Sequence, residues 1–455
     1  MRILIVGAGA IGSNLAGELA KSKEKNDVIV VESNHAIVKD LSSKIDALVI
    51  EGNGASPLIL EKAGIRDVEM VIAVSNSDEL NMIVCLLAAN YGVKTRVARI
   101  RNPDYVLPGS VLSQKQLNID KIIDPEAIAV EVMEALVFTA GATEIAHFAN
   151  KRVLLMVFLV PEGAPIAGRT LRQIREIVPD EFLIAAIQRG EEVIIPHGDE
   201  EVHENDRIHV IIPRDLLDLF LGQLYRRVEK VRKVVICGAT RLGINLARSV
   251  QKRIGDVTLL DPDHERCLKA AGELEGITVL HGSPLDTDML EEVRLKHAQV
   301  FCGLQEDDAA NVMSGLLAKE HGAGKTIVYL SEPDFVPIVE RIGLDAVINP
   351  RLLAVDAILK YVRGGPVMSV AHFDDLKAEV QEIVPVTGSA VVNRPLRELA
   401  RLLPKDALIG AVVHDDEVII PRGETMIEPG ERVIVFASEA ALPEVRRLFT
   451  ESAGI

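Results

Sequence analysis

A glycine-rich turn stands near the start of the sequence. Gly7, Gly9 and Gly12 follow a run of aliphatic residues and precede a stretch with helical pattern. In such a turn the first glycine permits the tight bend, the second lets the backbone approach a pyrophosphate, and the third allows close packing of helix on strand. The helix start adds N–H groups and a partial positive charge. The spacing therefore predicts a phosphate-binding loop.

A carboxylate closes the next apolar run. Glu32 stands where such a residue accepts hydrogen bonds from the ribose hydroxyls of adenosine. Because no arginine follows it closely, NAD(H) fits better than a dinucleotide with a 2′-phosphate. The alternative is a glycine turn in a similar sheet that binds nothing.

A second turn, VVICGATRLGINLA, occupies residues 234–247. Gly238 and Gly243 keep the bend and the packing contact, and Asp261 supplies the acid. Thr240, however, replaces the glycine at the closest approach to phosphate, and Arg241 adds a positive charge that could meet a further phosphate. Two interpretations stay open: a purely structural copy, or a working site with altered preference, for example for ATP or ADP.

Other polar residues are expected at the carboxyl edge of the first sheet, where ligands of open α/β folds bind. Arg99 ends the fifth strand and could reach a phosphate, and Asp78 is expected to be the N-cap of a helix. The remaining candidates at this edge are Gly52, Asn53, Gly54, Ser75, Asn76 and Asn81.

The elements that position these residues occur twice. Asp78 and Asp308, like Asn81 and Asn311, are 230 residues apart, and VIIP recurs at 193–196 and 418–421. Each copy alternates apolar strands with helices, which indicates a doubly wound parallel sheet, and continues into a small α+β module. The expected fold class is therefore α/β, with two Rossmann-like sheets. The expected domains are 1–140, 141–225, 231–364 and 365–455.

Two apolar helices, at 125–138 and 350–362, are expected to follow the two sheets. Asp124 is the expected N-cap of the first, with Pro125 at its first position. We expect these helices to form contacts between neighbouring lobes; the alternative is that each packs on its own sheet. The short charged junction at 226–233 predicts that the two halves touch.

Composition excludes several classes of protein. A net charge of −17 argues against a nucleic-acid partner. The four cysteines are far apart, so neither a disulfide framework nor structural zinc is expected, and the histidines 197, 203 and 209 have no ligand spacing; no metal is predicted. The start shows no signal peptide, and VLLMVFLV (153–160) is too short to span a bilayer. A reducing cytoplasm is expected.

The doubled pattern resembles a known family. GAGAIG, VIVVES, VIEGNGAS, AVSNSDELNM and ARIRNPDY, with GRTLRQI and the paired VIIP strands, resemble the regulator-of-potassium-conductance (RCK) domains of Trk-type potassium uptake systems, over essentially the whole chain. The resemblance implies a non-catalytic cytoplasmic subunit, peripheral on the inner face of the cell membrane. It implies self-association to a dimer or tetramer-like ring beneath an integral membrane potassium-translocating subunit. NAD(H) or adenine nucleotides would gate the flow.

The resemblance also implies two nucleotide sites. The first comprises Gly7, Ala8, Gly9, Ala10, Ile11, Glu32, Ser75, Asn76 and Arg99, to which the turn and sheet edge add Gly12 and Asn53. The second comprises Gly238, Ala239, Thr240, Arg241, Leu242 and Asp261, to which the turn adds Gly243. In related single-unit proteins an arginine at the place of Arg241 contacts the terminal phosphate of ATP.

Two rival functions remain. One is an RCK-type sensor that regulates another channel or carrier. The other is an NAD-dependent oxidoreductase, which needs an acid–base group beside the nicotinamide. None of the five tyrosines is followed by a lysine four residues on, and the small modules are short for a substrate domain. We therefore expect no catalysis.

Overall fold

The computed structural model describes residues 1–21, 26–105, 113–177, 182–190, 192–225, 229–362, 367–373, 378–415 and 417–450. The chain forms two compact units, Met1–Ile128 with Pro350–Arg363, and Ala129–Asn349 with Gly364–Ile455. The four-domain division expected from the sequence stays a prediction. Within the described residues, no helix has the length and apolar character needed to cross a membrane.

The first unit holds a parallel six-stranded sheet in the order β3-β2-β1-β4-β5-β6. Its strands are β1 (Arg2–Val6), β2 (Asp27–Glu32), β3 (Leu48–Glu51), β4 (Met70–Ala73), β5 (Thr95–Arg99) and β6 (Lys121–Ile123). Its helices are α1 (Ala10–Lys21), α2 (His35–Lys44), α3 (Pro57–Lys62) and α4 (Asp78–Asn90). Buried Val and Ile dominate β1, β2 and β4, as expected of a sheet covered on both faces.

A helix from the second half of the sequence completes the first unit. Helix α13 (Pro350–Val362) packs against α1, and its apolar face joins the core beneath the first sheet. Val355 and Ile358, for example, belong to one buried cluster with Ile3 and Leu15. This supports the expectation that the 350–362 helix contacts another lobe, since it covers the sheet of the first copy.

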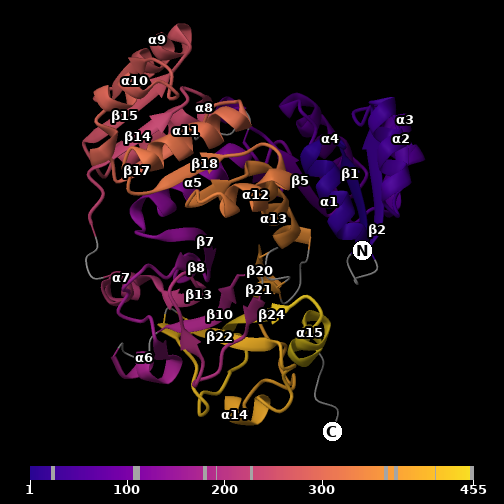
Figure 1. Cartoon of the computed structure of the whole chain (residues 1–455). Coiled ribbons are helices and arrows are strands. Elements are labelled where there is room, and N and C mark those ends of the chain that lie inside the picture. Colours follow the sequence, from indigo (N-terminus) through magenta and orange to yellow (C-terminus); the bar gives the residue numbers. More distant parts are fainter. Residues whose placement is uncertain are drawn as a thin grey trace. The chain divides into compact units, whose positions relative to one another are not determined.

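The second unit repeats the sheet in the order β16-β15-β14-β17-β18-β19. Its strands are β14 (Lys233–Cys237), β15 (Asp256–Asp261), β16 (Thr278–His281), β17 (Val300–Gly303), β18 (Thr326–Tyr329) and β19 (Ala346–Ile348). Its helices are α8 (Arg241–Gln251), α9 (His264–Glu273), α10 (Thr287–Glu292), α11 (Asp308–Glu320) and α12 (Val336–Arg341). Figure 1 shows β14, β15 and β17 among α8, α9, α10 and α11.

Helix α5 (Pro125–Phe138) stands in the corresponding relation to the second sheet: most of it belongs to the second unit, although it follows the first sheet in sequence. Asp124 caps it, as expected, by accepting from the N–H groups of Glu126 and Ala127. The part from Ala129 onward belongs to the second unit, where Lys325 Nζ donates to the carbonyls of Leu136 (2.7 Å) and Thr139 (3.2 Å). A helix from each half thus packs with the sheet of the other half.

Two small antiparallel sheets complete the second unit. The first, in the order β11-β10-β13-β8-β7, is formed by β7 (Ala142–Phe148), β8 (Val153–Leu159), β10 (Leu183–Arg189), β11 (Glu192–Ile194) and β13 (Arg207–Pro213). The second, β20-β21-β24-β22-β23, is formed by β20 (Val367–Phe373), β21 (Ala378–Ile383), β22 (Ala407–His414), β23 (Glu417–Ile419) and β24 (Arg432–Ser438). The further elements are β9 (Arg169–Thr170), β12 (Glu201–Val202), α6 (Leu171–Ile177), α7 (Leu217–Leu224), α14 (Leu396–Leu399) and α15 (Leu442–Thr450).

These two sheets pack face to face, as Figure 1 shows for β10 and β22. Phe148 and Leu155 share one buried cluster with Val380 and Phe436. The sequence of β8 indicates this packing. Its residues are apolar without the polar–apolar alternation of a strand with one exposed face, and the strand is buried on both faces.

Candidate functional sites at the two glycine turns

The first turn has the geometry that its glycines require. Gly7 has φ of +97°, and a Cβ there would lie 2.7 Å from the backbone of Ser75. A Cβ on Gly12 would lie 1.9 Å from the carbonyl oxygen of Gly7. These two glycines therefore serve the fold of the turn, since the left-handed conformation and the close approach both exclude a side chain.

Gly9 differs from its neighbours in the turn. A Cβ at Gly9 would meet no atom within 4 Å. The residue stands directly before α1, whose first residue, Ala10, is exposed. The protein itself thus leaves space above the helix start, where backbone N–H groups lack intrahelical partners and favour an anion.

Glu32 lies beside this turn at the end of β2. Its Oε2 accepts from the N–H of Ala8 (2.6 Å), and its Oε1 accepts from the N–H of Asn34 (2.8 Å) and from the hydroxyl of Ser33 (3.2 Å). The carboxylate is half-buried and can accept further hydrogen bonds, because each oxygen has two lone pairs. Glu32 therefore fixes the two loops and still offers an acceptor to a ribose hydroxyl.

Asn81 organises the ends of β4 and β5. Its side chain is fully buried; Oδ1 accepts from the N–H of Ser75 (2.9 Å), and Nδ2 donates to the carbonyls of Ser75 (3.1 Å) and Arg99 (2.9 Å). Because it satisfies the backbone of both strand ends at once, Asn81 positions residues at this edge and does not face a ligand.

Arg99 brings a cation to the same edge. Its Nη1 donates to Asn76 Oδ1 (3.1 Å) and to the carbonyl of Ser75 (3.4 Å), whereas its buried Nε has no hydrogen-bond partner. Among the described residues no carboxylate lies within ion-pair distance of it. Burial, followed by the charge of Arg101, lowers the pKa of Arg99, but an arginine stays charged at neutral pH. The charges of Asp78, Glu126 and Asp124 act on Arg99 from beyond ion-pair distance, so an anion at this edge would add a closer counter-charge.

The expectation for Asp78 is wrong. The N-cap of α4 is Ser77, whose hydroxyl accepts from the N–H of Leu80, and Asp78 is the first helical residue. Asp78 Oδ2 accepts from the N–H groups of Arg101 (2.9 Å) and Asn102 (2.8 Å), so it anchors the loop after β5.

Residues around the third strand have structural contacts of their own. Asn53 Oδ1 accepts from the N–H of Ala55, and a Cβ on Gly54 would lie 2.2 Å from the side chain of Val6. One contact in the loops after β4 and β5 was not predicted from the sequence: Arg101 Nη2 donates to the carbonyl of Asn76 (2.7 Å).

The second turn repeats the fold of the first. Gly238 has φ of +118°, and a Cβ on Gly243 would lie 1.9 Å from the carbonyl oxygen of Gly238. Asp261 Oδ2 accepts from the N–H of Ala239 (2.6 Å), as Glu32 does from Ala8. Asp261 is, however, only 2% exposed and also accepts from the N–H of Asp263.

Thr240 changes the start of the second helix. It is the N-cap of α8: its Oγ1 accepts from the N–H of Gly243 (3.2 Å) and donates to the carbonyl of Leu304 (3.1 Å). One of the N–H groups that a phosphate would use is therefore already satisfied by the protein. Leu242 is buried below the turn, and Arg241 is exposed at its rim.

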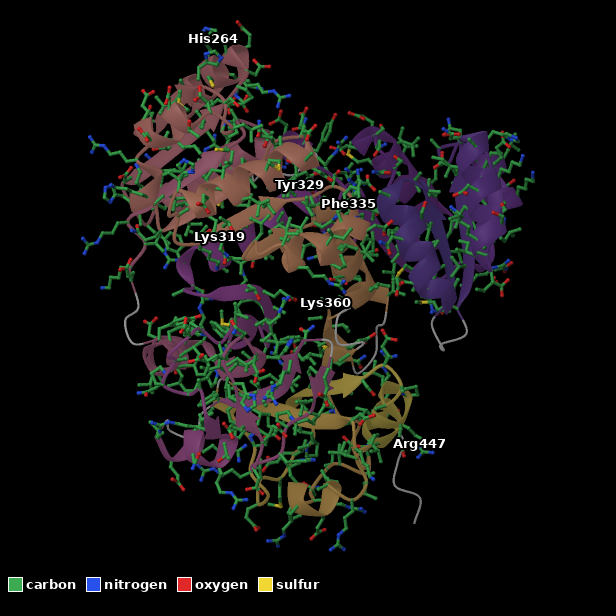
Figure 2. All side chains as sticks on the ribbon, viewed as in Figure 1. His264, Lys319, Tyr329, Phe335, Lys360 and Arg447 are labelled. Atoms are coloured by element: carbon green, nitrogen blue, oxygen red, sulfur yellow. The ribbon has the colours of Figure 1, made fainter. Side chains whose placement is uncertain are left out.

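The edge of the second sheet is also altered. Tyr329 ends β18 where Arg99 ends β5, and its carbonyl accepts from Asn311 Nδ2 (3.1 Å) in the same way. Across the neighbouring loops, Arg266 Nη2 lies 3.0 Å from Glu306 Oε2. Figure 2 labels Tyr329 and also His264, which begins α9 and stacks edge-on against His281. The half-buried guanidinium of Arg99 in the first copy is thus replaced by the phenol ring of Tyr329.

The two sheets and their glycine turns define the class of the protein. It is a Rossmann-like α/β fold that occurs twice, and each copy is followed in sequence by a small antiparallel sheet with short helices. A model of the TrkA-N domain matches residues 3–125 and 234–350, and one of the TrkA-C domain matches residues 155–224 and 380–450.

Curated relatives span the whole chain. The Trk system potassium uptake protein TrkA of Halomonas elongata is 32% identical and that of Haemophilus influenzae 33% identical, over 99–100% of this chain and 98–99% of theirs. TrkA homolog 2 of Methanosarcina mazei is 33% identical over 99% of this chain and all of its own.

Solved structures share the fold. The GsuK RCK domain superposes with a TM-score of 0.60 at 16% identity, covering 98% of this chain and 94% of that one. A GsuK channel bound to NAD gives 0.61 at 17% identity, covering 98% and 78%.

The chain belongs to the TrkA family of potassium uptake proteins, which confirms the resemblance and the expected fold class. As a member of this family it is a regulatory protein of potassium transport and not an enzyme.

Proposed function

We propose that the chain is the cytoplasmic regulatory subunit of a Trk-type potassium uptake system and that its first glycine turn binds NAD(H). The bound cofactor would change the potassium flow through an integral membrane partner. The curated relatives carry the name of this uptake system, and one protein of the same fold is described as a channel bound to NAD.

The space at Gly9 is the observation that carries this proposal. A turn kept open at its second glycine, above a helix start, is the place for a diphosphate. The carboxylate of Glu32 at one side would accept from the adenosine ribose, and the guanidinium of Arg99 at the sheet edge would offset the negative charge. The remaining residues of this proposed site are Gly7, Ala8, Ala10, Ile11, Gly12, Asn53, Ser75 and Asn76.

The second turn is proposed to have a different role. Thr240 satisfies the N–H of Gly243, Asp261 is shielded, and no arginine corresponds to Arg99, so a dinucleotide would bind weakly there. Exposed Arg241 would favour a ligand with a terminal phosphate, which keeps ATP or ADP as candidates. Gly238, Ala239, Leu242 and Gly243 complete this second proposed site.

Regulation then requires only differential affinity. A ligand shifts a two-state assembly by no more than its preference for one state, typically about 1–3 kcal/mol per site. We propose that self-association to a dimer or tetramer-like ring on the inner face of the membrane brings several such sites together, so that their preferences add.

Calorimetric titration of the full chain with NADH tests the first site. Gly9→Asp places a side chain in space that no protein atom occupies, so the fold should survive while the negative charge repels the diphosphate. We expect NADH affinity to fall by at least about a hundredfold, since an oriented phosphate contact is replaced by like-charge repulsion worth several kcal/mol. Gly17→Asp is the matched control, because a Cβ at Gly17 in α1 also meets no atom within 4 Å.

The outcomes separate the parts of the proposal. Equal NADH isotherms for the Gly9→Asp chain and the parent would refute binding at the first turn. Potassium flux into vesicles that hold the membrane subunit, measured with and without NADH, tests regulation. If NADH binds but flux does not respond, the sensor regulates another channel or carrier, and co-purification from membranes would identify its partner.

A further inference from the structure

Three side chains that belong to neither glycine turn meet at the second small sheet. His414 ends β22, and Glu428 and Glu431 belong to the loop before β24. Each offers one ligand atom, and these atoms all lie within 4.8 Å of one another. No residue spacing predicts this group, because His414 and Glu431 are brought together only by strand pairing.

The register of the sheet explains the meeting. Val413 pairs with Arg432 in the antiparallel β22–β24 ladder, so the next residues along the strands, His414 and Glu431, face each other. His414 Nδ1 lies 2.9 Å from Glu431 Oε1, and the N–H of Glu428 donates to Glu431 Oε2 (2.7 Å). The Glu431 side chain is 8% exposed and the imidazole 50%, so the group has one buried carboxylate and an open side.

The first small sheet shows what belongs at this position. There Gln188 pairs with Arg207, so Arg189 and Asp206 correspond to His414 and Glu431. The Arg189 guanidinium binds Asp206 through two hydrogen bonds, of 2.9 and 2.8 Å, and the N–H of His203 donates to Asp206 Oδ2 (2.7 Å) as Glu428 does to Glu431. In that copy the buried carboxylate therefore holds a cation that the chain supplies.

In the second copy, side chains that can bind a metal ion replace the arginine. An imidazole stands in place of the guanidinium, and Glu428 adds a second carboxylate where the first copy has His203. The exposed Asp415 carboxylate lies 3.8 Å from the other imidazole nitrogen. The two glutamates add two carboxylates at one imidazole, and a buried carboxylate such as that of Glu431 needs a counter-charge.

We propose that His414, Glu428 and Glu431 form a binding site for a divalent transition-metal ion, with Zn²⁺ as the probe. One imidazole and two carboxylates are ligands that zinc accepts, and three protein ligands leave a position open to solvent. Mg²⁺ is not expected, because it prefers an all-oxygen shell and imidazole does not suit it. The site does not depend on the nucleotide proposal, since it shares no residue with the glycine turns.

Zinc titration of the metal-free full chain by calorimetry tests the site, at one pH above the ordinary imidazole pKa. His414→Arg restores the residue type that holds the carboxylate in the first copy, so this variant should keep its fold while losing the ligand. We expect it to bind one Zn²⁺ fewer per chain than the parent. Glu428→Gln should weaken this site by at least about tenfold, the loss that even an outer-shell change causes.

His197→Arg, the same substitution at an exposed histidine in the loop between β11 and β12, is the control and should bind as the parent does. Circular dichroism checks that all variants are folded. A folded His414→Arg chain with the zinc stoichiometry of the parent would overturn the proposal. So would a parent chain without saturable zinc binding, because the His414–Glu431 pair would then hold a proton only.

Discussion

The hydroxyl of Thr240 lies 3.2 Å from the backbone nitrogen of Gly243 and accepts its hydrogen bond. At the equivalent place the first copy has Gly9, which has no side chain to do so. A single residue thus decides whether the helix start is satisfied internally or stays available to an anion. This contact separates two turns whose backbones otherwise agree.

Replacing Thr240 with glycine should convert the second turn toward the first. We expect the loss of the cap to lower the free energy of unfolding by a few tenths to about 2 kcal/mol. We also expect nucleotide affinity at the second turn to rise, because an N–H group becomes available. Calorimetry with NADH and with ATP, in a chain whose first turn carries Gly9→Asp, isolates this effect. Unchanged isotherms would show that Thr240 does not limit binding.

Gly12 and Gly9 should respond in opposite ways to alanine. Gly12→Ala places a Cβ 1.9 Å from the carbonyl oxygen of Gly7, and such overpacking typically costs about 1–3 kcal/mol or more. Gly9→Ala meets no atom and should change stability by under about 0.5 kcal/mol. Amide hydrogen exchange in β1 and α1 measures both within the first unit. Equal protection in the two variants would contradict the assigned roles.

Asn81 should be a stability residue that also affects binding. Asn81→Ala leaves the part-buried N–H of Ser75 and the carbonyl of Arg99 without their partner, and each such loss costs about 1–3 kcal/mol. We expect the first unit to lose about 2–4 kcal/mol and NADH affinity to fall with it. Asn90→Ala, which removes an exposed bond to the carbonyl of Leu86, is the control. Similar urea transitions for both variants would argue against this role.

Local patterns sufficed for the turns and the sheets, because these depend on neighbours in sequence. Gly7, Gly12 and Glu32 could be assigned from spacing alone, and strand–helix alternation indicated both parallel sheets. The sequence shows at Thr240 only that a side chain replaces glycine, whereas the structure adds that its hydroxyl accepts from the N–H of Gly243. Asp78 was misassigned because Ser77, one residue earlier, competes for the same cap.

Non-local packing was harder to predict. Nothing near Val355 says which sheet it covers, and the face shared by Leu155 and Phe436 depends on segments far apart in the chain. The same holds for His414 and Glu431, which only the strand register brings together. Periodicity shows that a face is buried but does not identify its partner.

Lys325 should make the second unit more stable as the pH rises above neutrality. Its buried amine donates to the carbonyls of Leu136 and Thr139, and burial lowers its pKa to about 7, whereas the nearby charge of Asp345 acts against this. Between about pH 7 and the ordinary lysine pKa of about 10.4, the unfolded chain binds more protons than the folded one. The free energy of unfolding must then increase with pH, by up to about 1.4 kcal/mol per unit.

Urea denaturation at several pH values across this range tests the effect in the parent and in Lys325→Met. The methionine cannot titrate, so we expect its stability to rise less steeply with pH than that of the parent. Lys269→Met is the matched control, because Lys269 is exposed on α9 of the same unit. Parallel pH profiles for the parent and Lys325→Met would mean that the Lys325 amine is charged in the folded protein throughout this range. Its contacts with the end of α5 would then be insensitive to pH.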